Sequence, residues 1–315
     1  MFGDIFSRGG ARISGVFLGS PEAEAEANDA SRMPLSEVYF DYHNLGDQIS
    51  AEKFIIVGRK GCGKSAFAEF VNLSSRSSSN LFSKFVRKDD YRLDELTQAA
   101  GKSGFEIDPI TFFKWIIYTH IIRLFLQSES AKSSQKMALV DTFLKKNSGY
   151  VDINEYSVKE ILSKKGINVN VEPLRRFLRL SSLKDVETKQ ERAPYYQLIP
   201  HLEDVVKHIL SSRNEAINRN SYVLFFDDLD IGYKAKNSES REILVSLLRA
   251  AKHVNSTIFG GSNAKVVVLL RDDLENDLID AFPDTAKCRA TLGVRLLTLE
   301  GLVKKIKAHL EELST

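Results

Sequence analysis

The feature that most constrains this chain is a glycine-rich run, Gly58 to Ser65, with the sequence GRKGCGKS. It fits the pattern G-x-x-x-x-G-K-[ST]. The run follows an apolar, β-branched segment, 53–57 (KFIIV), and leads into 64–73 (KSAFAEFVNL), where Phe67 and Phe70 recur at helical spacing. A loop between a buried strand and a helix directs successive backbone N–H groups and the helix N-terminus towards an anion. The sequence therefore predicts a phosphate-binding loop, the alternative being a chance match in a glycine-rich turn.

Three residues of the loop can be considered individually. Lys64 is predicted to contact the β- and γ-phosphates of a nucleotide, and the Ser65 hydroxyl to hold Mg²⁺. Cys62 has two interpretations, because a thiol at a helix N-terminus beside cations can be reactive, or it can simply be a small residue tolerated there. The predicted nucleotide-binding residues are Gly58, Arg59, Lys60, Gly61, Cys62, Gly63, Lys64, Ser65 and Ala66.

A second apolar strand, 222–226 (YVLFF), leads directly to Asp227. Mg²⁺ at a phosphate loop needs a carboxylate from the end of another buried strand, so Asp227 is predicted to bind the metal together with Ser65. Asp228 follows at the position where it would polarise an attacking water, and is the predicted catalytic base. The alternative is a solvated acidic turn, which would also explain the sequence from Asp227 to Asp230.

A third strand, 265–270 (KVVVLL), ends on Arg271. Similar ATPases carry a polar sensor of the γ-phosphate at this place, and this resemblance predicts Arg271 as a catalytic residue with Lys64 and Asp228. The alternative interpretation is a surface arginine that pairs with Asp272 or Asp273.

Short apolar strands that alternate with helices predict an α/β fold, with a parallel sheet covered by helices on both faces. About 160 residues separate Lys64 from Asp227, more than a compact α/β unit needs, so a helical insertion is expected there, with a clear helix start at Asp108 and Pro109. The expected parts are a mobile leader (1–33), the first part of the core (34–90), a mainly helical insertion (91–220) and the second part of the core (221–315). Strands are expected at 53–57, in the centre of the sheet, and at 81–87, 222–226, 265–270 and 294–299.

Bulk properties limit the partners and the compartment. With 44 basic and 42 acidic residues the net charge is only +2, so nucleic-acid binding is possible through a local face but is not indicated by the net charge. Two cysteines cannot build a disulfide framework, which favours a reducing cytoplasm. Residues 1–18 lack the apolar stretch of a signal peptide. The apolar segment 110–126 is short and carries basic side chains, so we expect a buried helix and no membrane partner.

At these motifs the chain resembles P-loop ATPases of the additional-strand class, which carry a further strand between the two motif strands. The run 224–230 (LFFDDLD) resembles the D-D-L-D signature of KAP-type ATPases, and 267–273 (VVLLRDD) resembles the sensor strand of STAND-type ATPases. The leader 16–24 (VFLGSPEAE), together with the phosphate loop, is similar to the bacterial FunZ-like group, whose members often belong to antiphage defence systems. The resemblance implies a sheet order of 5-1-4-3-2 and binding of ATP with Mg²⁺. Asp228 replaces the glutamate of vigorous hydrolases, which implies slow turnover.

The expected function is that of a slowly hydrolysing ATPase that acts as a nucleotide-dependent switch or assembly subunit, as a homo-oligomer or with a partner effector protein. No arginine finger is evident, and in this class the missing cation commonly comes from a neighbouring subunit. One alternative is a small-molecule or nucleotide kinase, with Arg175, Arg176 and Arg179 as a phosphate-binding lid. The other is an ATP-binding scaffold that does not hydrolyse.

The nucleotide that the chain prefers is predicted from motifs that the sequence lacks and from aromatic residues that it contains. There is no N-K-x-D element for guanine, and no L-S-G-G-Q-like segment before Tyr222, so ATP is favoured over GTP and an ABC-type ATPase is disfavoured. Tyr39, Phe40 or Tyr42 would supply a wall for the adenine ring. The competing interpretation is that these aromatic residues belong only to the core.

Overall fold

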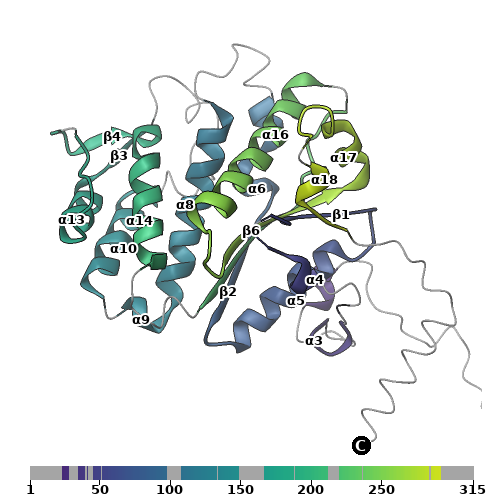
Figure 1. Ribbon diagram of the computed structural model, residues 1–315, viewed down its shortest axis with the longest axis horizontal. Helices are drawn as coiled ribbons and strands as arrows, with labels where there is room; N and C mark the ends of the chain where they lie inside the picture. Colours follow the sequence, from purple (N-terminus) through teal and green to yellow (C-terminus); the bar gives the residue numbers. More distant parts are fainter. Residues whose placement is uncertain are drawn as a thin grey trace, which may run out of the picture.

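The computed structural model in Figure 1 contains a parallel β-sheet with helices on both faces. The structure describes residues 23–27, 35–39, 41, 45–50, 52–97, 108–132, 134–148, 167–187, 189–211, 220–235, 237–283 and 285–291.

The main sheet has five parallel strands in the order β2-β5-β6-β1-β7. The central strand is β6, and β1 lies second from one edge. The expectation that segment 53–57 is central is therefore wrong, because β6 inserts between β1 and β5 while, among the described strands, only the short β7 adds outside β1. The strands are β1 (Ile55–Gly58), β2 (Leu81–Val86), β5 (Ser221–Phe226), β6 (Ala264–Arg271) and β7 (Arg289–Thr291).

Four of the strands lie where the apolar runs predict them, to within about two residues. The fifth differs, because β7 forms at Arg289–Thr291, whereas the predicted strand 294–299 lies outside the described residues. The register places Gly58 beside Arg271 and Val86 beside Phe226. The carboxyl ends of β1, β2, β5 and β6 therefore meet at one edge of the sheet.

Side chains of the sheet alternate between two buried layers, as the period of a strand requires. Ile56, Phe225 and Val267 pack with Phe67 of α5 (Lys64–Ser77) on one face. Their neighbours Ile55, Phe226 and Val268 belong to the larger core on the other face. Both faces are covered, which is why the strands are almost continuously apolar.

Helices fill both layers (Figure 1). The α5 face also carries α2 (Ala23–Glu26), α3 (Leu35–Val38) and α4 (Leu45–Gln48). The opposite face is covered by α8 (Pro109–Gln127) and α16 (Ser238–His253), with α14 (Ile199–Ser211) packed against α8. Within the predicted leader, α2 packs on α5 and Ala27 is buried.

The predicted helix start at residues 108 and 109 is confirmed. The Asp108 side chain accepts a hydrogen bond of 2.9 Å from the Ile110 N–H, and Pro109 occupies the first turn of α8. By length and composition α8 is apolar enough to cross a membrane, but 72% of its apolar window is buried inside the protein. That burial is typical of a core helix in a soluble protein.

The region between β2 and β5 is mostly helical among its described residues, but it also contains a two-stranded antiparallel sheet that the sequence did not predict. Its strands have only three residues each, too few for an alternating pattern to stand out. The remaining elements within the described residues are α6 (Lys88–Tyr91), α9 (Glu129–Lys132), α10 (Gln135–Lys146), β3 (Asn168–Asn170), α13 (Glu172–Leu180), β4 (Arg192–Pro194), η3 (Tyr195–Leu198), η4 (Val254–Ile258), α17 (Asp272–Leu278) and α18 (Thr285–Cys288).

Candidate functional site

The glycine-rich loop leaves the end of β1 and turns into α5. Gly61 and Gly63 have φ angles of +78° and +94°, in the left-handed region that L side chains rarely adopt. A Cβ atom at either position would meet nothing within 4 Å. The backbone conformation, and not crowding, therefore demands glycine at these two positions, and the space beside them is open.

Lys64, the first residue of α5, folds back over the loop. Its Nζ donates to the Gly58 carbonyl oxygen at 2.8 Å and to the Arg59 carbonyl oxygen at 2.9 Å, and it lies 3.9 Å from the Cys62 sulfur. Lys64 is only 9% exposed. The ammonium group is thus held at the mouth of the loop, next to the backbone that would surround a phosphate.

The structure joins the loop to the end of β5. The Ser65 hydroxyl donates to Oδ2 of Asp227 at 2.9 Å, although the two residues lie 162 positions apart in the chain. Asp227 is buried, and its carbonyl oxygen accepts a hydrogen bond of 2.6 Å from the hydroxyl of Tyr91. Burial, followed by the charges of Asp228 and Asp227, raises the pKa of Tyr91, so this hydroxyl remains a donor.

Asp228 has a left-handed backbone, with a φ of +60°. Its N–H donates to Oδ1 of Asp227 at 2.8 Å. Non-glycine residues in this region are uncommon, and aspartate and asparagine are the most tolerant of it. The turn continues to Gly232, where a Cβ would come within 3.2 Å of the Asp94 nitrogen. The acidic turn is therefore tightly positioned against the segment that follows α6.

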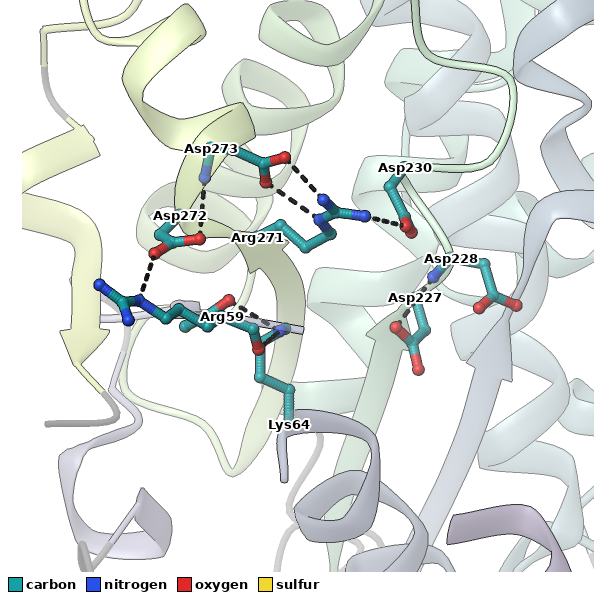
Figure 2. A network of polar contacts seen from close by, with 9 residues as sticks. Arg59, Lys64, Asp227, Asp228, Asp230, Arg271, Asp272 and Asp273 are labelled. Carbon is teal, nitrogen blue, oxygen red and sulfur yellow. Dashed lines mark hydrogen bonds and ion pairs between the residues drawn. The ribbon is translucent and has the colours of Figure 1, made fainter. Parts of the chain in front are cut away.

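Arg271 lies at the end of β6 between two carboxylates, as Figure 2 shows. Its guanidinium donates to both oxygens of Asp273, at 3.0 and 2.7 Å, and to Asp230 at 2.8 Å. Hydrogen bonds to Asp273 and Asp230 raise the pKa of Arg271, and the same contact lowers the pKa of Asp273. Beside this cluster Arg59 approaches Asp272 at 3.5 Å. The ends of β1, β5 and β6 are thereby linked by ion pairs.

One cavity of about 820 Å³ unites these groups. Most of the predicted site residues line it, whereas Gly58, Arg59 and Cys62 do not. Five basic and three acidic side chains face it, so its lining is positive overall and suits an anionic ligand. The lining residues are Ala23, Lys60, Gly61, Gly63, Lys64, Ser65, Ala66, Arg87, Lys88, Asp227, Asp228, Leu229, Asp230, Ile231, Leu269, Arg271 and Leu274.

Sequence reasoning missed several of these lining residues. Arg87 and Lys88 follow β2, and Ala23 comes from the predicted leader. Arg87 ended the predicted strand 81–87, and the carboxyl ends of parallel strands are a known place for ligand-binding groups. That position was the available signal for Arg87, whereas nothing in the sequence pointed to Ala23.

The three arginines of the alternative kinase lid do not line the cavity. Arg175 donates to the Gln190 carbonyl oxygen at 2.8 Å, and Arg176 and Arg179 pair with Glu172 and Asp185. All three belong to α13, which lies far from α5 in Figure 1.

Among the aromatic candidates for an adenine wall, only Tyr39 lies within the described residues. Its ring stacks on Phe70 of α5 at 4.7 Å and packs against the core on that face of the sheet. Phe40 and Tyr42 lie outside the described residues. One face of the Tyr39 ring is thus already covered by the Phe70 ring.

No protein family, characterised protein or solved structure matches this chain significantly. Within the residues that the structure describes, no group of three or more His, Cys, Asp or Glu side chains is arranged to hold a metal ion by itself. A metal at this site would therefore depend on ligand oxygens and water as well as on the protein.

Proposed function

We propose that the protein binds ATP with Mg²⁺ at this cavity and hydrolyses it slowly as a P-loop ATPase. The observation that carries the proposal is the contact between Ser65 and Asp227 at 2.9 Å. It brings together a hydroxyl at the start of α5 and a carboxylate at the end of a neighbouring strand, in a cavity that Lys64 also lines.

The residues present suit a magnesium nucleotide. Mg²⁺ usually keeps several waters and takes one or two protein ligands beside substrate phosphates, and Ser65 with Asp227 would supply such a pair. The open space at Gly61 and Gly63 would admit the phosphates close to the backbone. Bound there, the metal would neutralise charge on the phosphates. The Lys64 ammonium would exchange its two carbonyl partners for phosphate oxygens.

The sheet order supports the same class. Numbered along the chain, the five strands read 5-1-4-3-2 from β7 to β2, the order implied by the resemblance to additional-strand ATPases. Asp228 would accept a proton from a water molecule whose oxygen attacks the γ-phosphorus, while the bond from that phosphorus to the oxygen of ADP breaks. Arg271 would approach the γ-phosphate only after leaving Asp230 or Asp273. The α13 arginines pair elsewhere, which disfavours the kinase alternative.

Replacing Asp227 by Asn is expected to remove the dependence of ATP affinity on Mg²⁺. Titration of the wild-type protein with ATP should show tighter binding with Mg²⁺ than with EDTA, and Asp227→Asn should show equal binding in both. Asp185→Asn, which changes a carboxylate on the far side of the insertion, should behave like wild type. An Asp227→Asn protein that keeps the full effect of Mg²⁺ would refute the metal assignment.

We further propose that ATP controls assembly, with the protein acting as a cytoplasmic homo-oligomer or with an effector protein. The large helical layer formed by α8, α10, α13 and α14 extends well beyond the cavity and supports this role (Figure 1). Light scattering at micromolar protein should show a larger mass with Mg²⁺ and ATP than with Mg²⁺ alone. A monomer in both conditions would refute the assembly switch and leave only an ATP-binding domain.

A further inference from the structure

Arg87 is a basic residue of the cavity and follows β2, the strand that pairs with β5. Val86 pairs with Phe226 in the sheet, and the Asp227 N–H donates to the Val86 carbonyl oxygen at 3.2 Å. Arg87 and Asp227 therefore follow directly after the last residues of two neighbouring strands, β2 and β5. The Arg87 N–H in turn donates to Asp90 at 2.8 Å, so the backbone of Arg87 is held in place at the cavity wall.

The Arg87 side chain contacts α5 at Glu69. One guanidinium nitrogen lies 2.5 Å from Oε1 of Glu69, and the guanidinium stacks over the Phe85 ring at 4.5 Å from its centre. Glu69 is one helical turn beyond Ser65, a rise of about 6 Å. Arg87 thus pairs with a residue one helical turn from Ser65, whose hydroxyl contacts Asp227.

The proposed ATPase needs a cation that can contact the phosphates, and the position of Arg87 suits this role. Arg271 faces the cavity, but its guanidinium is engaged by three hydrogen bonds to Asp230 and Asp273. Arg59 is largely exposed and does not line the cavity. Arg87 does line it, its side chain is 34% exposed, and it borders the cavity together with Ser65 and Asp228.

We propose that Arg87 contacts the terminal phosphate of ATP bound in the same chain, exchanging Glu69 for that phosphate. The assignment rests on the proposed function. An arginine fork matches phosphate oxygens in two-pronged hydrogen bonds, which a lysine cannot reproduce. Glu69 keeps a hydrogen bond from Asn72 at 3.3 Å when Arg87 leaves. The cation expected from a neighbouring subunit is then supplied in cis, and Arg87 makes the site distinguish ATP from ADP.

The decisive comparison is between Glu69→Gln and the double variant Glu69→Gln/Arg87→Gln. Both lack the ion pair, so they differ only in whether Arg87 is present. With Mg²⁺, the double variant should bind ATP about 10- to 100-fold more weakly than Glu69→Gln, the usual effect of losing one charge-assisted contact, with unchanged ADP affinity. Equal ATP affinities in the two variants, or equal losses for ATP and ADP, would overturn the assignment.

Two further experiments distinguish this assignment from alternative explanations. Arg87→Lys keeps the positive charge but not the two-pronged hydrogen bonds of the guanidinium group, so it should retain part of the preference for ATP over ADP. If the double variant fails to fold, Arg87→Lys takes its place in the comparison. Mixing the double variant with Lys64→Ala should restore no hydrolysis, and restored hydrolysis would mean that Arg87 serves a neighbouring chain. A wild-type protein that binds neither nucleotide would overturn the proposed function as well, whereas wild-type binding without an Arg87 effect overturns this assignment alone.

Discussion

Replacing Asp228 by Asn is expected to slow ATP hydrolysis by about 100-fold or more, while ATP affinity stays close to that of wild type. A carboxylate that accepts a proton in the transition state typically contributes 10²- to 10⁴-fold, and the amide cannot accept it. Asparagine tolerates the φ of +60° as well as aspartate does, and the backbone hydrogen bond from residue 228 to Asp227 does not depend on the side chain. Phosphate release under single-turnover conditions measures the effect.

The rate of the Asp228 variant also decides between the ATPase and the scaffold. If Asp228→Asn hydrolyses ATP at the wild-type rate, the base lies elsewhere, and Asp230 is the next carboxylate on the cavity wall. If the wild-type protein binds ATP but releases no phosphate, the protein is a scaffold that uses ATP only as a ligand.

Replacing Lys64 by Ala is expected to weaken ATP binding by roughly 10- to 150-fold, because charge-assisted hydrogen bonds contribute about 1.5–3 kcal/mol each. ADP should be affected as well, since Lys64 also reaches the β-phosphate in the proposed complex. Isothermal titration with Mg²⁺ measures both affinities. The matched control is Lys60→Ala, which removes another lysine from the same cavity wall and should have a much smaller effect.

The Lys64 variant must also be shown to be folded, because its ammonium bonds to two loop carbonyls. Thermal unfolding close to that of Lys60→Ala would show that only the ligand contact is lost. Wild-type ATP affinity in Lys64→Ala would contradict the phosphate-loop assignment.

The parts of the fold that could be predicted are those with a strong local pattern. The runs at 222–226 and 265–270 are so apolar that only buried strands explain them, and both are strands in the structure. Since carboxyl ends of parallel strands share an edge, the motifs at Ser65, Asp227 and Arg271 could be expected to meet, and the structure brings them to one cavity.

The remaining features depend on pairings that no local pattern records. Strands β3 and β4 have three residues each, and their pairing joins Asn168 to Pro194 across a long stretch of chain. Arg271 could be found from the end of its strand, but its partner Asp230 lies on another turn and is revealed only by tertiary structure. Arg87 belongs to the same group, because its contact with Glu69 joins a strand end to a helix that precedes it.

The order of strands in the sheet has a consequence for how the chain reaches its native state during synthesis. Strand β1 pairs only with β6 and β7, and β2 pairs only with β5 among the described strands. Neither of the first two strands can therefore find its neighbour until the ribosome has made the chain beyond Ser221. Contacts between such distant segments form slowly, because a long loop must close first. Until then the apolar strand before the glycine-rich loop has no strand partner, and unpaired apolar strands are prone to aggregation.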